Sequence, residues 1–298
     1  MVRPKIDTKS KILSISHNDL DGVVCQIILG QVYKNIHYIN ASFYKIDSIL
    51  KEIHFDEYDY VFLTDIHPDE QENLYLSDKI IMIDHHKSAK NMHNPSKFHY
   101  VLTDYCASVY VKNFIKSLYK IKLTHLDQLV YLTNDYDMYY LKNPKSKLLY
   151  DLMFNFYKPH KFRNEFFNGR TKFNINEIEW LKKRRKEYEK RWNNLDVYEL
   201  NSIKGCIIEQ SDFMNEIADR LINEECYRVV LIRNPFTQRV SIRHNIDNFD
   251  AGKFLKDRGW GGGHERAAGM FLDGEEDFLS KINIIEKYIA NNFDLVRI

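Results

Sequence analysis

The chain has 298 residues, 44% of them apolar, which is enough for about two domains with sizeable hydrophobic cores. Its 43 basic and 42 acidic side chains leave a formal charge of +1, which excludes a polybasic protein that holds long nucleic acid or an anionic membrane by bulk charge. Eleven glycines and six prolines are too few for a low-complexity or collagen-like chain.

The N-terminal residues MVRPKIDTKSKI contain no apolar core of the signal-peptide kind, and no later stretch has the ~18 apolar residues of a membrane span. We therefore expect a cytoplasmic protein. The cysteines at positions 25, 106, 206 and 226 are isolated, which favours free thiols over a disulfide framework. A metal site would need other ligands.

Short β-rich runs alternate with helical periodicity through the first 140 residues, which is typical of a parallel sheet covered by helices. Strands are expected at 11–15, 36–40, 59–63 and 79–83, and helices near 23–32, 48–53, 108–119 and 126–133. Open α/β sheets bind ligands beyond the carboxyl ends of their strands. Functional residues are therefore expected at those ends.

Residues 141–192 are predicted to be mostly helical and end in the run WLKKRRKEYEKRW. They carry a net charge of +9, against −3 for residues 1–140 and −5 for residues 193–298. A helix rich in lysine and arginine is more often a solvated face whose side-chain stems pack down. The alternative is an electropositive rim beside a phosphate site.

Strand and helix signals return in the last third of the chain. Strands are expected at 205–208, 227–232, 239–243 and 267–272, and helices at 213–223, near 252–255 and from Glu276 onward. We predict two α/β domains, with a mainly parallel sheet and flanking helices at 1–140 and a smaller mixed-sheet domain at 201–298. A basic helical segment at 141–200 links them, and the active site is expected in the cleft between the domains.

Carboxylates and imidazoles gather where the predicted strands end. The motifs are SHNDLDG with His17, Asp19 and Asp21, FLTDIHP with Asp65, IMIDHHKS with Asp84, His85 and His86, and the later YLTNDYDMY with Asp135 and Asp137. Carboxylates on one rim repel each other unless a cation holds them. Oxygen ligands with a few imidazoles and no thiolates favour Mn²⁺, or Mg²⁺ or Co²⁺, over structural zinc.

Each motif alone has a simpler explanation. An Asp-Gly pair after a strand is often only a turn, an aspartate at a strand end often caps the next helix, and a single buried histidine is usually structural. The joint occurrence of the motifs, in order and at carboxyl ends of strands, indicates a pair of metal ions instead. An aspartate on the third strand, between the other two, suits a bridge between ions about 3.5–4 Å apart.

Glycine is concentrated late in the chain, with seven of the eleven between Gly252 and Gly274. The segment GWGGGHERAAG contains Gly261, Gly262, Gly263, His264 and Arg266, and VSIRHN upstream contains Arg243. Consecutive glycines let backbone N–H groups approach an anion, and a guanidinium can hold phosphate in two places. Alone the segment would be a glycine-rich hairpin or helix cap, but beside a metal site it suggests a substrate clamp.

Together these motifs resemble the DHH phosphoesterase family, named after the triplet Asp84-His85-His86. SHNDLDG, FLTDIHP, IDHH and TNDYD match the four motifs of its catalytic domain. VSIRHN followed by GGGHERAAG matches its DHH-associated substrate domain, so the resemblance covers nearly the whole chain. It implies catalysis by residues 1–140 and substrate binding by residues 201–298.

The resemblance also implies a role for each motif residue. Two Mn²⁺ ions would be bound by Asp19, Asp21, Asp65, His85 and Asp135, and Asp65 would bridge them. His86 would contact the scissile phosphate, and Asp84 would orient a neighbouring imidazole. Arg243, Arg266 and the turn from Gly261 to His264 would hold the phosphate or terminal nucleotide. His17 is a further candidate ligand, although it lies two and four residues before the aspartates, whereas many members have spacings of four and six. The sequence also leaves open whether Asp137, two residues after Asp135, binds metal.

The activity implied is metal-assisted hydrolysis, in which a metal-bound water attacks phosphorus in line. A substrate domain can recognise a chain end, and the length leaves no room for the additional single-strand-binding module of RecJ-type exonucleases. The leading hypothesis is thus a Mn²⁺-dependent exonuclease of the nano-RNase or oligoribonuclease kind, which cleaves short oligonucleotides to mononucleotides. Membranes and long duplex DNA are not expected partners, and a homodimer is compatible with the sequence.

Other functions remain open. Within the same chemistry these are a phosphatase for 3′-phosphoadenosine 5′-phosphate and a phosphodiesterase for cyclic or linear dinucleotides, whereas the glycine-rich ending disfavours a manganese-dependent pyrophosphatase. A different class is a nucleotide- or short-RNA-binding protein without catalysis. That hypothesis predicts replaced ligands, but Asp19, Asp21, Asp65, His85 and Asp135 are all present.

Overall fold

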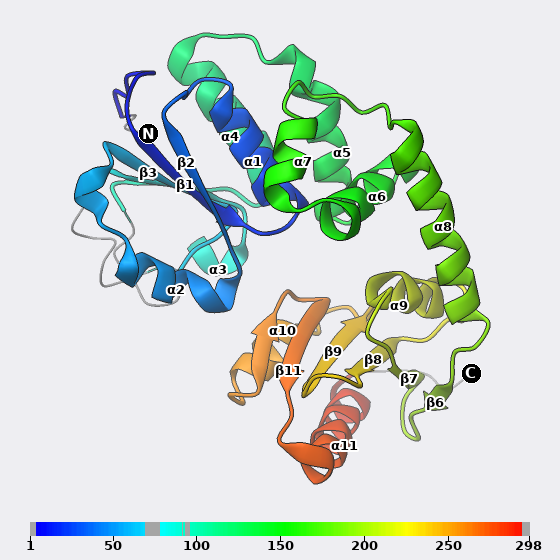
Figure 1. The fold of residues 1–298 in the computed structure, drawn as a ribbon. Coiled ribbons are helices and arrows are strands. Elements are labelled where there is room, and N and C mark those ends of the chain that lie inside the picture. The colour runs from blue at the N-terminus through cyan, green and yellow to red at the C-terminus, as the bar shows by residue number, and fades with distance from the viewer. Residues whose placement is uncertain (1–3, 69–77, 91, 93–95, 294–298) are drawn as a thin grey trace. The chain divides into compact units, whose positions relative to one another are not determined.

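The computed structural model contains two sheets, one in each of the units into which the chain divides, residues 1–183 and 184–298 (Figure 1). The structure describes residues 4–68, 78–90, 92 and 96–293. The first sheet is parallel and the second is mixed, which confirms the α/β fold class predicted from the sequence. Within the described ranges, no helix combines the length and the apolar character that crossing a bilayer requires.

The first sheet has five parallel strands in the order β2-β1-β3-β4-β5. They are β1 (Ile12–His17), β2 (Ile36–Ala41), β3 (Tyr60–Thr64), β4 (Ile80–Asp84) and β5 (Phe98–Val101). Side chains alternate between two cores, so that Phe62 packs on one face while Val61 and Leu63 pack on the other. Both faces of the inner strands are therefore buried, as their continuous apolar runs predict.

Helices cover both faces of this sheet (Figure 1). The core on one face includes residues of α1 (Leu20–Gly30), α4 (Ala107–Tyr119) and α5 (Asp127–Asp137), and the core on the other includes residues of α2 (Phe43–Glu52) and α3 (Lys87–Lys90). The four strands predicted in this region are present, whereas β5 and α3, each only four residues long, were not predicted.

The Asp-Gly pair after β1 has a structural reason to be there. A Cβ atom on Gly22 would lie 2.2 Å from the carbonyl oxygen of His17, so only glycine lets α1 start this close to the strand. Asp19 caps the helix, because its Oδ1 accepts a hydrogen bond from the Gly22 N–H at 3.0 Å. Strand, cap and helix thus fix the backbone around the SHNDLDG motif.

The basic segment is helical, as predicted, and consists of α6 (Pro144–Asp151), a π-helical turn (Leu152–Phe156), α7 (Pro159–Glu165) and α8 (Ile175–Trp192). The start of α8 is fixed by Asn174 and Glu177, which accept hydrogen bonds from each other's backbone N–H groups. The Glu177 carboxylate is fully buried and accepts from Arg170 Nη2 at 2.7 Å. The division between the two units falls within α8.

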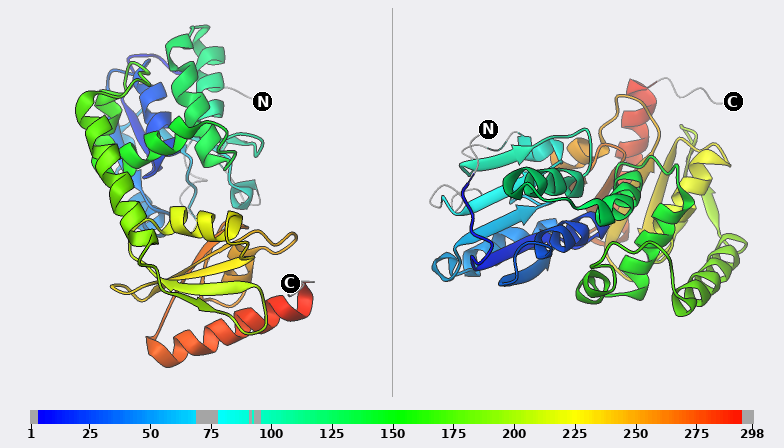
Figure 2. Two further views of the ribbon diagram at one scale, coloured as in Figure 1. Left: turned by 90° about the vertical axis from the view of Figure 1, so that its right-hand side faces the viewer. Right: turned by 90° about the horizontal axis from the view of Figure 1, so that it is seen from above.

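The second sheet has the order β10-β11-β9-β8-β7-β6, in which only β7 and β8 pair in parallel. Its strands are β6 (Val197–Glu199), β7 (Gly205–Glu209), β8 (Val229–Asn234), β9 (Arg239–His244), β10 (Gly261–Gly263) and β11 (Ala267–Phe271). Its helices are α9 (Met214–Asn223), α10 (Ala251–Lys256) and α11 (Gly274–Asn292), with α9 and α11 on opposite faces, in yellow and red in Figure 2.

The three consecutive glycines form the edge strand β10, which pairs antiparallel with β11, so the segment is the glycine-rich hairpin that the sequence also suggested. Gly261 must be glycine because a Cβ atom there would lie 2.0 Å from the carbonyl oxygen of Gly269 on β11. Gly263 has φ +146° and would also place a Cβ atom against β11, 2.7 Å from the carbonyl oxygen of Ala267. A strand that consists of glycines is hard to recognise from the sequence, because glycine is depleted in strands.

Candidate metal centre

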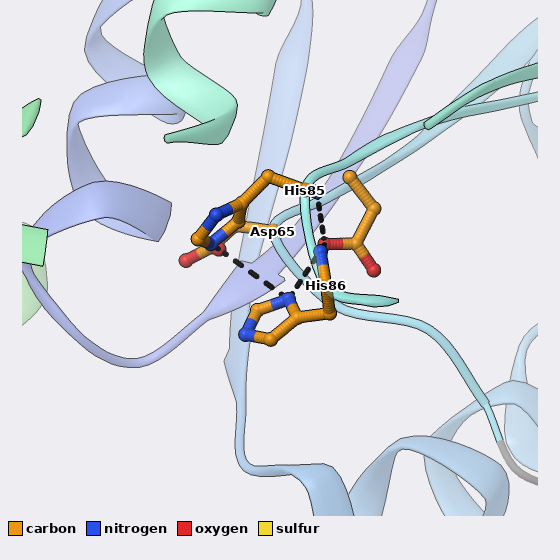
Figure 3. Close-up of side chains that lie close together, drawn as sticks. Asp65, His85 and His86 are labelled. Atoms are coloured by element: carbon orange, nitrogen blue, oxygen red, sulfur yellow. Dashed lines mark hydrogen bonds and ion pairs between the residues drawn. The ribbon is translucent and has the colours of Figure 1, made fainter. Parts of the chain in front are cut away.

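The ends of three parallel strands bring the predicted aspartates and histidines together at one edge of the first sheet. His17 ends β1, Asp65 directly follows β3, and His85 directly follows β4. His85 Nε2 lies 3.2 Å from Asp65 Oδ1, and His17 Nδ1 lies 3.9 Å from Asp65 Oδ2. Figure 3 shows the Asp65 carboxylate beside the rings of His85 and His86. The two oxygens of one carboxylate therefore face two different histidines.

Asp65 is held in an unusual conformation. Its φ of 59° is in the left-handed region, and its N–H donates to the carbonyl oxygen of Ile83 at 3.0 Å, which keeps it joined to β4. The side chain is 1% exposed, and neither carboxylate oxygen has a hydrogen-bond partner among the described residues. Strained backbone of this kind persists where function requires a particular side-chain direction.

The carboxylates of this edge differ in their affinity for protons. Burial, and then the negative charges of Asp19 and Asp21, raise the pKa of Asp65 well above its ordinary value. Burial and the same two aspartates also raise the pKa of Asp137. Burial would raise that of Asp19 as well, but the adjacent His17 outweighs it and lowers the pKa. Without a cation, Asp65 and Asp137 therefore hold a proton more tightly than an ordinary aspartate does.

Asp19 and Asp21 also hold backbone groups. Asp19 Oδ2 lies 2.8 Å from His17 Nδ1 while its Oδ1 caps α1. Asp21 accepts from the N–H groups of Ala107 at 2.7 Å and Ser108 at 3.0 Å, and so caps α4 from a distant part of the chain. Each of these carboxylates is therefore fixed in place by a hydrogen bond at a helix start.

The structure does not bring Asp135 into this group. Its carboxylate accepts from the N–H groups of Lys142 and Asn143, each at 3.0 Å, and from Ser146 Oγ at 2.8 Å, so it fixes the connection between α5 and α6. Asp137 lies with the other ligands instead, with its Oδ2 3.4 Å from His85 Nε2. Of these two aspartates, Asp137 lies with the other candidate ligands and Asp135 does not, and metal binding by either residue stays a prediction.

Cys106 lies beside this group, within 4.8 Å of ligand atoms of Asp21 and Asp137. Burial and the charge of Asp21 raise the pKa of its thiol well above the ordinary value. The thiol thus stays protonated, which agrees with a donor set of oxygen and nitrogen atoms.

A second layer of contacts holds the DHH triplet. Asp84 Oδ1 lies 2.7 Å from His86 Nδ1, and Asp84 Oδ2 lies 2.7 Å from His67 Nδ1. Burial opposes ionisation of Asp84, but His86 and His67 hold its pKa well below the ordinary value. Sequence reasoning did not identify His67, although it lies in the FLTDIHP motif two residues after Asp65.

We expect His67→Phe to lower kcat about 10- to 100-fold with a small effect on KM, because Asp84 would lose one of the two imidazoles that fix it, and such outer contacts commonly have effects of this size. The measurement is steady-state hydrolysis of a dinucleotide, with the melting temperature as a check on folding. The control is His37→Phe, which removes an exposed histidine bonded to Tyr58 Oη at 3.0 Å. Equal kcat in the two variants would exclude a positioning role for His67.

The predicted substrate residues lie in the second unit. Arg243, at the end of β9, donates to Asn215 Oδ1 from Nε at 3.3 Å and from Nη2 at 2.8 Å. Arg266 Nη2 lies 3.1 Å from Asp247 Oδ1 on the surface, and His264 follows the edge strand β10. Asn215 was not identified from the sequence, because no local pattern connects α9 with β9.

Gly262 differs from its two neighbours. A Cβ atom there would meet nothing closer than the carbonyl oxygen of Gly252 at 4.0 Å. The packing of the second unit therefore does not require glycine at this position. A glycine that packing does not require, on an edge strand, can leave backbone accessible to a ligand.

No protein-family model matches the chain. It is similar to a 3′,5′-cyclic-nucleotide phosphodiesterase of Helicobacter pylori, at 28% identity over 153 residues that are 43% of this chain and 44% of that protein. It is also similar to Oligoribonuclease NrnB of Bacillus subtilis, at 24% identity over 312 aligned positions that cover 93% of this chain and 75% of that protein.

Among solved structures, exonuclease RecJ bound to manganese has a TM-score of 0.61 to this chain at 13% identity, over 98% of this chain and 92% of that one. The likeness extends over both units and establishes the fold. The alignment with the Helicobacter protein, in contrast, spans less than half of that protein's length.

Proposed function

We propose that this chain, which is similar to proteins of the DHH phosphoesterase family, is a metal-dependent phosphodiesterase that hydrolyses short oligonucleotides to mononucleotides. The observation that carries the proposal is the position of Asp65. Its two buried oxygens have no hydrogen-bond partner among the described residues and face His85 and His17 respectively. A carboxylate that bridges two cations needs one oxygen on each side.

The residues fit a pair of divalent cations. Buried atoms without a hydrogen-bond partner in the described part of the chain converge there, namely Asp65 Oδ1 and Oδ2, Asp137 Oδ2 and His85 Nε2. Each such atom costs about 1–3 kcal/mol if nothing binds it. Asp19, Asp21, Asp65, His85 and Asp137, with His17, would hold the cations, and this hard donor set favours Mn²⁺ or Mg²⁺.

When bound, the cations would supply a water of lowered pKa and neutralise charge on the phosphoryl oxygens. The protein's own groups would orient the substrate. His86 contacts Asp84 through Nδ1, so its Nε2, on the other side of the ring, would be the atom that contacts a phosphoryl oxygen. The ionised Asp84 fixes the orientation of the His86 ring, which would let the ring donate a hydrogen bond to an oxygen on which negative charge develops during hydrolysis.

Short oligonucleotides are the substrate class that we favour. One relative is named an oligoribonuclease and another a cyclic-nucleotide phosphodiesterase, and both names support a small nucleotide substrate for this chain. The second unit offers an accessible glycine backbone on β10 and Arg243 oriented by Asn215, both suited to a phosphate or a terminal nucleotide. Free thiols at Cys25, Cys106 and Cys206 fit a reducing compartment, and we place the activity in the cytoplasm.

The test uses purified protein with Mn²⁺ and a panel of substrates in parallel. The panel contains a labelled dinucleotide, a 5-mer, a 20-mer, 3′-phosphoadenosine 5′-phosphate and cyclic dinucleotides. We expect mononucleotide release that is fastest on the 2-mer and 5-mer and slow on the 20-mer. Preferred hydrolysis of 3′-phosphoadenosine 5′-phosphate or of cyclic dinucleotides would redirect the proposal to those substrates. Binding without product under any metal would overturn it in favour of a non-catalytic binding protein.

The glycine strand gives a matched pair of variants. Gly262→Ala should raise KM for a dinucleotide about 10-fold or more while the melting temperature stays within about 2 °C, because the added methyl group meets no protein atom but obstructs a ligand. Gly261→Ala should instead lower stability by roughly 2–4 kcal/mol, because its methyl group collides with β11. An unchanged KM in Gly262→Ala would mean that substrate does not approach β10.

A further inference from the structure

Three aromatic rings form a continuous stack next to the metal ligands. The ring centroids of Tyr136 on α5 and Tyr150 on α6 are 4.2 Å apart at an interplanar angle of 19°. Those of Tyr150 and Phe154, in the π-helical turn, are 5.6 Å apart at 11°. We call Tyr136, Tyr150 and Phe154 the aromatic stack. Near-parallel, offset rings of this kind have the geometry in which a nucleobase stacks on a protein.

The first residue of the aromatic stack is the chain neighbour of a candidate metal ligand, and its last residue lies at the surface. Tyr136 directly precedes Asp137, whose carboxylate lies 3.4 Å from His85 Nε2. Phe154 at the other end is 56% exposed. All of these residues belong to the first unit. A ring that only joined α5 to α6 would be expected inside the packing, whereas the last ring of this stack is open to solvent.

The π-helical turn explains how Phe154 reaches this position. Tyr150 and Phe154 are four residues apart on a continuous helical path, so the rings project from the same side. The π-helical turn, Leu152–Phe156, includes Phe154 and is wider than an α-helix. Such turns are rare overall, but many of those known lie at functional sites. Two buried neighbours, Leu152 and Met153, anchor the turn in the core, so that Phe154 is held outward.

The surroundings of the aromatic stack are basic and rich in exposed rings. Tyr139 and Tyr140, between Asp137 and α6, are exposed, and Lys142 lies over the Tyr140 ring at 5.4 Å. Residues 139–163 contain six basic side chains and one acidic side chain. Lysines beside exposed aromatic rings are the combination that single-stranded nucleic acid requires, because the rings stack on bases and the ammonium groups contact phosphates.

We infer that the aromatic stack is the nucleobase platform of this enzyme, on which a base of the substrate oligonucleotide stacks against Phe154 while Lys142, Lys145 and Lys158 contact its phosphates. The inference rests on the proposed function and adds a substrate class to it. A stacking surface reads no base edge, so recognition is independent of sequence but requires a base. The substrate is therefore a single-stranded oligonucleotide, and an ester without a base at the stacked position is a poor substrate.

The test compares Phe154→Leu with Phe154→Trp on a 5-mer and on the same 5-mer with abasic sites. Leucine keeps apolar surface but offers no ring, so KM for the base-containing 5-mer should rise about 5- to 100-fold, whereas tryptophan should keep it within about 2-fold. Neither variant should change KM for the abasic 5-mer, which should be high in the unaltered protein too. The control is Phe236→Leu, a highly exposed ring in the second unit and outside any stack that involves described residues.

A second measurement separates this inference from the proposed function. Polarisation of a fluorescein-labelled 5-mer, recorded with metal chelated, reports binding without turnover. Weaker binding of Phe154→Leu, rescued by Phe154→Trp, would support the nucleobase platform even if the protein hydrolysed nothing. Equal binding and equal KM in the leucine and tryptophan variants would overturn it, while hydrolysis by the unaltered protein would leave the proposed function standing.

Discussion

Replacing Asp65 with asparagine is expected to abolish hydrolysis and, at the same time, to stabilise the metal-free protein. The two effects have one origin. The carboxylate is almost fully buried, has no hydrogen-bond partner among the described residues, and faces like charges at Asp19 and Asp21. Asparagine keeps the shape, tolerates the left-handed backbone of position 65, and removes the charge. Function and stability therefore require opposite residues at this position.

The expected magnitudes follow from the role of the bridge. Loss of a ligand shared by two cations should lower kcat by about 1000-fold or more. Removal of an unpaired buried carboxylate should raise the free energy of unfolding of the metal-free protein by roughly 1–3 kcal/mol near neutral pH. Because the pKa of Asp65 is raised in the folded state, the folded state binds more protons, and unfolding free energy falls as pH rises above the ordinary aspartate range. The variant should lose part of this pH dependence.

Thermal unfolding with EDTA and with Mn²⁺, together with hydrolysis of a dinucleotide, measures all of these effects. Mn²⁺ at about 100 times its dissociation constant should stabilise the unaltered protein by ~2.7 kcal/mol and the variant far less. Asp56→Asn, at an exposed position outside the sheet edge, should leave hydrolysis and the Mn²⁺ response unchanged. Hydrolysis by Asp65→Asn above a few per cent of the unaltered rate would show that the bridging position is wrong.

The architecture of the metal centre was predictable because it depends on strand ends. In a parallel sheet all carboxyl ends meet at one edge, so a residue's place relative to its strand already says where it lies. This argument placed His17, Asp65 and His85 correctly relative to the sheet. It could not find the contact between His67 and Asp84, because His67 follows the strand in a loop whose path the sequence pattern does not specify.

The glycine-rich segment shows a different limit. Its composition correctly indicated that backbone segments approach each other closely, but the contacts that require glycine are within the protein. Gly261 and Gly263 lie against β11, and Gly252 lies against the carbonyl oxygen of Gly263. Only the three-dimensional packing distinguishes these from Gly262, where a methyl group would meet open space. A run of identical residues thus combines structural and functional positions that the sequence cannot separate.

The fourth motif combines both limits, because Asp135 and Asp137 are chemically identical and adjacent on one helix. Residues two apart on an α-helix project about 200° from each other, so only one of them can face the strand ends. Which one does so depends on the residues that follow: the N–H groups of Lys142 and Asn143 and the hydroxyl of Ser146 bind Asp135. These contacts hold Asp135 at the connection between α5 and α6, while Asp137 lies among the candidate metal ligands.

Asparagine should consequently lower kcat at position 137 and lower the free energy of unfolding at position 135. Asp137→Asn should lower kcat about 100-fold or more with little loss of stability, because it removes a candidate ligand whose burial raises its pKa. Asp135→Asn should lower the free energy of unfolding by roughly 2–4 kcal/mol, because an amide NH₂ group would face donors that require an acceptor. The Mn²⁺ affinity of Asp135→Asn, measured by calorimetry at a temperature where the variant is folded, should stay within about 3-fold of the affinity of the unaltered protein. The reason is that the hydrogen bonds of Asp135 go to the connection between α5 and α6 and not to the candidate ligands.

The pH dependence distinguishes the two further. Burial opposes ionisation of Asp135, but the three hydrogen bonds to its carboxylate lower its pKa in the folded state. The contribution of Asp135 to the free energy of unfolding is therefore complete above the ordinary aspartate pKa range, and it is lost as pH falls through the lowered pKa. Asp135→Asn should therefore cost most at neutral pH and least in acid. Asp137 has a raised pKa, so Asp137→Asn should become relatively more stabilising as pH rises in EDTA. If Asp135→Asn instead abolished the Mn²⁺ response and kept its stability, Asp135 would be the ligand, and the helix rotation on which the metal centre depends would have to be reversed.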